Sequence, residues 1–80
     1  MTNSEKYDKA FMEALSISAE DLKGTGIEYG NIGEWDSIGH MILITALEKE
    51  FDIMLDTDDI IDMSSYEKGK EILLKYKIEI

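Results

Sequence analysis

A cluster of four glycines followed by a long apolar segment limits how this chain can fold more than any other part of its sequence. The glycines lie within ten residues, at Gly24, Gly26, Gly30 and Gly33. They interrupt any helical or strand periodicity, so we expect a long loop over residues 16–36. Because a structureless loop of this length is unusual in a compact domain, its apolar residues should pack against the helices: Ile17, Leu22, Ile27 and Ile32.

The first half of the chain predicts two long helices. Over residues 4–15 the apolar residues recur at helical spacing. A capping signal at residues 18–21 allows one further turn. The apolar segment from Ser37 to about Glu50 predicts the second helix, with a serine in its first turn.

This second helix has two apolar stripes, where a surface helix needs only one. The expected core stripe consists of Leu43, Ile44, Leu47 and Phe51. A neighbouring stripe that begins beside Ser37 consists of Ile38, Met41, Ile42 and Thr45. Two interpretations are open: the helix is broadly buried, or the second stripe is a patch accessible to partner enzymes.

The second half of the chain predicts two more helices. Acids crowd residues 56–59 and apolar residues follow, a pattern that favours a short helix over about residues 56–63. Ser64 and Glu67 have the spacing of a capping box, which predicts a last helix that runs to about Tyr76. Gly69 lies inside this last helix and should cost about 1 kcal/mol relative to alanine.

Charge and composition exclude several classes of function. Eighty residues allow one domain with a small core. With eighteen acids, eight lysines and a net charge of −10, the chain lacks the basic face that nucleic acid binding needs. It has no cysteine and no apolar run long enough to span a membrane. Because residues 1–5 lack the basic and apolar regions of a signal peptide, we expect a soluble, cytoplasmic protein. We also expect it to be a monomer.

Acidic residues are concentrated in residues 48–62, which contain seven acids and one lysine. Two interpretations are open for this segment. It is either a solvated surface, or a docking face that attracts basic partners over a long range. The second interpretation makes Glu48, Asp58 and Asp59 candidate partner-binding residues.

Three catalytic or metal-binding arrangements can be set aside. Asp36, Ser37 and His40 are the residue types of a hydrolase triad, but three groups within five residues of one helix start cannot easily build its geometry. His40 is the only histidine and has no ligand cluster in the sequence, so we expect it to pack on the helix flank. Residues 56–67 have the outer carboxylates of a calcium loop, but Ile61 stands where that loop needs glycine. We therefore expect no catalytic residue and no metal site.

Ser37 is instead well placed to carry a phosphate. The first turn of a helix has backbone N–H groups without intrahelical partners, and together with the helix dipole they favour negative charge. Asp36 can cap the same turn or act as a recognition charge. Trp35 can bury its ring and hold the loop in place.

Three segments resemble the phosphopantetheine-binding acyl carrier protein family. Trp35–Gly39 resembles the attachment motif of the family, Asp-Ser-Leu, Ala46–Phe51 resembles the end of its second helix, and Ile60–Leu73 resembles its third and fourth helices. The resemblance covers nearly the whole chain, so residues 1–80 are identified as a single acyl carrier domain. It implies an all-α, four-helix bundle with a long loop between the first two helices and a short third helix.

The resemblance also implies a function. In this family a phosphopantetheinyl transferase esterifies the serine of the motif, here Ser37, with the 4'-phosphopantetheine arm of coenzyme A. The thiol of the arm holds acyl groups as thioesters, and the domain presents them to acyl-loading and acyl-transferring enzymes without being an enzyme itself. The residues that would then face these partners next to the serine are Asp36, Ile38, Met41 and Ile42.

One difference from the family bears on the pathway. Fatty-acid carriers usually place acids in the first turns after the serine, whereas residues 39–42 here contain none. This difference favours a stand-alone carrier of a dedicated biosynthetic pathway, such as polyketide, hybrid peptide or cell-surface glycan acylation. The alternative hypothesis, from another class, is an unmodified small acidic helical interaction module.

Overall fold

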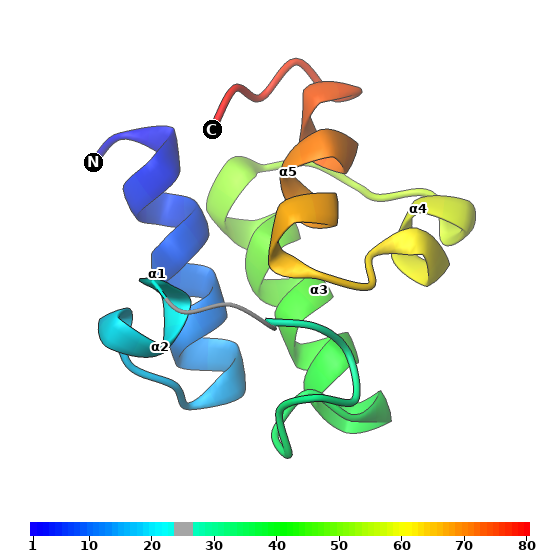
Figure 1. Cartoon of the computed structure of the whole chain (residues 1–80). Helices are drawn as coiled ribbons and strands as arrows, with labels where there is room; N and C mark the ends of the chain where they lie inside the picture. The colour runs from blue at the N-terminus through cyan, green and yellow to red at the C-terminus, as the bar shows by residue number, and fades with distance from the viewer. Residues whose placement is uncertain (24–26) are drawn as a thin grey trace.

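A computed structural model describes residues 1–23 and 27–80, and within them the chain forms five helices (Figure 1). In chain order they are α1 (Asn3–Leu15), α2 (Ala19–Lys23), α3 (Ser37–Phe51), α4 (Thr57–Asp62) and α5 (Tyr66–Leu74). Two glycines of the predicted loop, Gly24 and Gly26, lie outside the described residues. In the part of the chain that the structure covers, no helix combines the length and apolarity needed to cross a membrane.

The all-α class predicted from the sequence is confirmed. The four predicted helices correspond to α1, α3, α4 and α5, and α4 is the short one. The extra helix α2 is the single turn allowed by the capping signal at residues 18–21. There the Ser18 N–H donates to the Asp21 carboxylate at 3.0 Å, and the Asp21 N–H donates to the Ser18 hydroxyl at 3.3 Å.

The start of α5 differs from the prediction by one residue. Ser65, not Ser64, caps the helix, and its hydroxyl accepts the Lys68 N–H at 2.9 Å. The Ser64 carbonyl instead accepts the Tyr29 N–H at 2.9 Å. The predicted capping box of Ser64 and Glu67 is therefore wrong. Hydrogen bonding to the distant loop keeps the backbone extended as far as Ser65, so the helix begins one residue later. The helix also ends at Leu74, slightly earlier than predicted.

The core lies between α1 and α3, with α5 packed beside them (Figure 1). From the predicted core stripe, Leu43, Ile44 and Leu47 are buried, and Phe51 is half-buried against the core. The four apolar loop residues, Ile17, Leu22, Ile27 and Ile32, also pack against the core, as predicted. The buried apolar residues are Tyr7, Ala10, Phe11, Leu15, Trp35, Leu43, Ile44, Leu47, Leu55, Met63, Ile72, Leu73 and Ile78.

Gly69 has a packing role that its sequence position did not reveal. It is buried, and a Cβ atom added there would lie 2.1 Å from the Tyr7 hydroxyl oxygen. That hydroxyl donates to the Tyr66 carbonyl at 2.5 Å, so it cannot move away freely. Burial raises the pKa of Tyr7 well above its usual range, so the hydroxyl remains a donor. Gly69 is therefore where α5 approaches α1 closely, rather than only a weak point of the helix.

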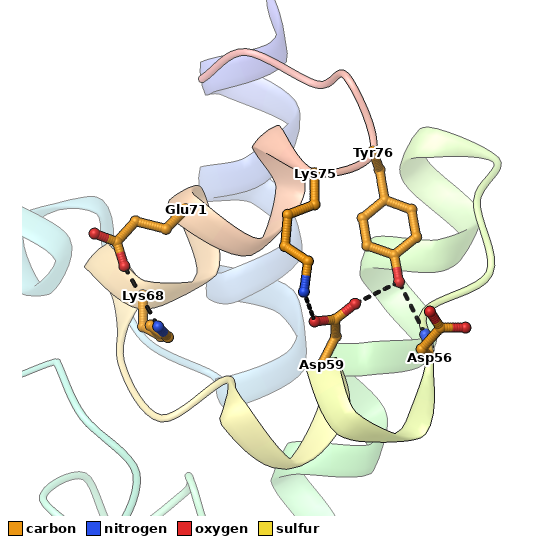
Figure 2. Close-up of polar contacts among 6 residues, drawn as sticks. All are labelled: Asp56, Asp59, Lys68, Glu71, Lys75 and Tyr76. Atoms are coloured by element: carbon orange, nitrogen blue, oxygen red, sulfur yellow. Dashed lines mark hydrogen bonds and ion pairs between the residues drawn. The ribbon is translucent and has the colours of Figure 1, made fainter.

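The buried carboxylate of Asp59 joins α4 to the end of α5 (Figure 2). Its side chain accepts hydrogen bonds from the Lys75 ammonium at 2.5 Å and from the Tyr76 hydroxyl at 2.7 Å. The Tyr76 hydroxyl also accepts the Asp56 N–H at 2.9 Å. The neighbouring pair of Lys68 and Glu71, 3.6 Å apart, lies on the exposed surface of α5 and contributes little.

The ion pair of Asp59 predicts a pH dependence of stability. The hydrogen bonds from Lys75 and Tyr76 lower the pKa of the Asp59 carboxyl from its ordinary value of 3.8. A carboxyl with a lower pKa in the folded state stabilises the fold fully above its unfolded pKa, and this contribution is lost as the pH falls through the folded pKa. The hydrogen bond to Asp59 also raises the pKa of Lys75 above 10.5, so the lysine contribution is complete below that pH and is lost as the pH rises through the raised pKa.

We therefore expect Asp59→Asn to lower the melting temperature at neutral pH and to flatten its decline below about pH 4. The measurement is thermal unfolding followed by circular dichroism across the pH range. Asp58→Asn is the matched control, because Asp58 is the neighbouring acid and is exposed. If the melting temperature fell equally steeply below about pH 4 in Asp59→Asn and in the parent, the role assigned to Asp59 would be contradicted.

Candidate functional site

The site is the junction of the glycine-rich loop with α3. Asp36 is the N-cap, and its carboxylate accepts the Gly39 N–H at 2.9 Å. Its carbonyl accepts the His40 N–H at 2.8 Å. Ser37 is then the first residue of α3, and it is exposed. The predicted position of Ser37 in the first turn of this helix is therefore confirmed, and Asp36 acts as the cap.

Gly39 allows the loop to lie directly against the start of α3. A Cβ atom at this position would lie 1.9 Å from the carbonyl oxygen of Glu34. Because that oxygen belongs to the backbone, a side chain at Gly39 would push the whole loop away from the helix. The loop is closed by two further bonds, from the Trp35 N–H to the Ile32 carbonyl at 2.9 Å and from the Gly30 N–H to the Trp35 carbonyl at 3.1 Å.

Trp35 and His40 connect the loop, α3 and α4. The Trp35 ring is fully buried, as predicted, and packs edge-on against Phe11 with the ring centroids 5.5 Å apart. Its indole N–H donates to the His40 Nδ1 atom at 2.9 Å. Because an indole can only donate, Nδ1 is the acceptor, and the proton of the neutral imidazole lies on Nε2. This nitrogen donates to the Ile60 carbonyl at 2.7 Å, so His40 links helices rather than only packing on a flank.

Tyr29 is the site residue that the sequence did not indicate. Its hydroxyl oxygen lies 3.2 Å from the Ser37 hydroxyl oxygen, within hydrogen-bond distance. Tyr29 comes from the loop, where no periodicity places a side chain. A tyrosine eight residues before the serine cannot be recognised as its neighbour from the sequence, because the path of the loop must be known first.

The second apolar stripe of α3 is exposed. Ile38, Met41 and Ile42 are 73%, 56% and 50% exposed, so the broadly buried helix is excluded. These side chains line a groove of about 630 Å³ that also includes Ser37. A second groove of about 370 Å³ begins on the other side of the serine, between α3 and α4, and is lined by Tyr29, Ser37, His40, Met41, Ile60, Ile61, Met63 and Ser64.

The four candidate acids lie in different environments. Asp36 and Asp58 are exposed, although one oxygen of Asp36 is used by the cap. Glu48 is half-buried, and its carboxylate accepts the Leu55 N–H at 2.9 Å. Asp59 is only 3% exposed and is bound to Lys75 and Tyr76. The expectation of a common acidic face therefore does not fit Asp59, because its carboxylate points into the protein.

The arrangement around Ser37 is not that of a hydrolase. The imidazole of His40 uses both of its nitrogens on Trp35 and Ile60, so neither is directed at the serine hydroxyl. The Asp36 carboxylate binds the backbone of Gly39 rather than the imidazole. Across residues 1–23 and 27–80, no group of three or more His, Cys, Asp or Glu side chains could hold a metal ion.

Comparison with known proteins identifies the family. No family model matches the chain, and no solved structure matches it. An acyl carrier protein of Nitratidesulfovibrio vulgaris, strain Miyazaki F, is 35% identical over 77 residues, which cover 89% of this chain and all of that relative. Acyl carrier proteins of the DP4 and Hildenborough strains are each 37% identical over 59 residues, 74% of this chain and 76% of theirs. The chain therefore belongs to the acyl carrier protein family and is a carrier rather than an enzyme.

Proposed function

We propose that this carrier holds acyl intermediates as thioesters on a 4'-phosphopantetheine arm attached to Ser37. A phosphopantetheinyl transferase would transfer the arm from coenzyme A to the Ser37 oxygen, which breaks the pyrophosphate bond of coenzyme A and releases adenosine 3',5'-bisphosphate and the serine proton. Acyl-loading and acyl-transferring enzymes of a dedicated biosynthetic pathway would then use the arm. The arm supplies a terminal thiol, which the chain itself lacks because it has no cysteine. The single observation that carries the proposal is the exposed Ser37 hydroxyl in the first turn of α3, beside two apolar grooves.

The residues around Ser37 fit a phosphodiester. The first-turn N–H groups of a helix have no acceptor four residues earlier within that helix, and the helix dipole favours an anion near them. Asp36 caps the Gly39 N–H, which leaves the N–H groups of Ser37 and Ile38 as the nearest first-turn donors. The Gly39 contact with Glu34 keeps the loop close to the helix without covering the exposed serine.

Intact mass spectrometry tests the proposal directly. The protein is incubated with coenzyme A, Mg²⁺ and a broad-specificity phosphopantetheinyl transferase. We expect the mass to increase by one phosphopantetheine and no more. A mass that stays unchanged, with an established carrier protein modified in the same reaction, would favour the unmodified interaction module.

The partner surface that we propose consists of the apolar stripe of α3 together with exposed acids. Ile38, Met41 and Ile42 are exposed beside the serine, and flexible Met41 suits contact with more than one partner. Exposed Asp36 and Asp58 could pair with basic groups of an enzyme. The mainly apolar character of this stripe supports recognition by dedicated enzymes.

Truncating one side chain from each apolar stripe of α3 should distinguish the exposed stripe from the core stripe. Because Ile42 is half exposed, we expect Ile42→Ala to melt within about 4 °C of the parent. It should nevertheless slow acyl transfer by the dedicated enzyme. Ile44→Ala, on the same helix but 2% exposed, is the matched control and should lose about 2–5 kcal/mol of stability. Equal losses of stability in the two variants would show that Ile42 belongs to the core.

A further inference from the structure

The backbone of Tyr29 is fixed by pairing with the segment between α4 and α5. Glu28 and Ser65 form an isolated antiparallel bridge. On either side of it, the Tyr29 N–H donates to the Ser64 carbonyl and the Tyr66 N–H donates to the Ile27 carbonyl, each at 2.9 Å. The backbone of Tyr29 therefore has a defined position, although this residue belongs to a long loop.

The ring of Tyr29 is also held in one orientation. It meets the His40 ring edge-on, with the centroids 5.6 Å apart and an angle of 89° between the planes. It meets the Trp35 ring in a similar way, at 6.4 Å and 74°. His40 and Trp35 are themselves joined by a hydrogen bond, so they form a rigid support for the tyrosine. The ring directs its hydroxyl to the Ser37 hydroxyl, 3.2 Å away.

Packing alone does not account for a tyrosine at this position. Tyr29 is 46% exposed, so its burial contributes less than that of the core aromatics. Its hydroxyl partner is the exposed side chain of Ser37, and an exposed hydrogen bond adds little to stability. The ordered position of the hydroxyl therefore has more consequence for chemistry at Ser37 than for the fold.

We infer that the Tyr29 hydroxyl is a positioning group for the phosphodiester on Ser37, an inference that rests on the proposed function. In the unmodified protein either hydroxyl can donate to the other. Esterification removes the serine hydrogen, so only the Tyr29 hydroxyl can then donate. Its acceptor becomes an oxygen of the phosphodiester, and a hydrogen bond to an anionic oxygen is stronger than the neutral one it replaces. The phosphate is thus held on the side of α3 that faces Tyr29.

Phosphorus NMR of the loaded protein tests this inference. Tyr29→Phe keeps the ring and removes only the hydroxyl, and Tyr76→Phe makes the same change at a hydroxyl bound to Asp59 instead. All three proteins are loaded to completion with excess transferase, as judged by intact mass. We expect the phosphodiester resonance of Tyr29→Phe to be displaced from the parent by more than the line width, and that of Tyr76→Phe to coincide with the parent. The melting temperature of Tyr29→Phe should stay within about 4 °C of the parent.

The possible failures can be told apart. If the parent gains no mass, both the proposed function and this inference fall. If the parent is loaded and the phosphorus resonances of the parent and Tyr29→Phe coincide, the inference alone is overturned. An equal displacement in Tyr76→Phe would also overturn it, since a remote hydroxyl would then have the same effect.

Discussion

Ser37→Ala should abolish the gain of phosphopantetheine while leaving the fold intact. The Ser37 oxygen is the nucleophile in the proposed attachment, so its removal should eliminate the mass increase completely. The fold should survive because the cap of α3 is made by Asp36 and the loop is held by Trp35 and Gly39. Among the residues that the structure describes, the only side-chain hydrogen bond that the variant loses is the exposed one to Tyr29. Intact mass after transferase treatment, together with a thermal melt, measures both effects.

Ser64→Ala is the matched control for this experiment. Ser64 is another exposed serine and lines the same groove of about 370 Å³ as Ser37. It does not begin a helix, because Ser65 caps α5. The Ser64 variant should therefore be loaded like the parent. Loading of Ser37→Ala would show that the attachment site is elsewhere, and unfolding of that variant would show that Ser37 has a structural role.

Features that depend on neighbouring residues could be predicted from the sequence. Helices α1 and α3 follow from apolar residues at helical spacing. The surplus stripe of α3 indicated the exposure of Ile38, Met41 and Ile42 as one of two interpretations, and the structure selects it. The position of Ser37 follows because a glycine-rich loop ends where an apolar helix begins. All of these signals lie within a few turns of the chain.

Features that depend on distant residues could not be predicted. The N-cap of α5 was displaced by one position because the Ser64 carbonyl pairs with the Tyr29 N–H, 35 positions earlier in the chain. Asp59 looked like one acid among several, but its partner Lys75 is 16 residues away. Tyr29 reaches Ser37 because the hydrogen bond to the Ser64 carbonyl fixes the loop. Each of these contacts joins residues that no local pattern relates.

Gly69→Ala distinguishes the sequence-based expectation from the structure by the sign of its effect. Helix propensity alone predicts that the alanine stabilises α5 by about 1 kcal/mol. In the structure the added Cβ would lie 2.1 Å from the Tyr7 hydroxyl oxygen and 3.2 Å from the Tyr7 Cζ atom. Tyr7 is fully buried and cannot withdraw without losing its bond to the Tyr66 carbonyl. Because overpacking of a core typically costs about 1–3 kcal/mol, we expect a net loss of stability.

A double-mutant cycle assigns this loss to the contact between Gly69 and Tyr7. Tyr7→Phe removes the oxygen at 2.1 Å, so Gly69→Ala should cost about 0.5–3 kcal/mol less in that background than in the parent. Urea unfolding measures the free energies of unfolding of the four proteins. Gly33→Ala is the control and should be close to neutral, since a Cβ at Gly33 would contact no atom of the described residues within 4 Å, apart from Gly33 itself and its two chain neighbours. If Gly69→Ala instead stabilised the parent, α5 would have room for a side chain at this position, and helix propensity would decide the effect.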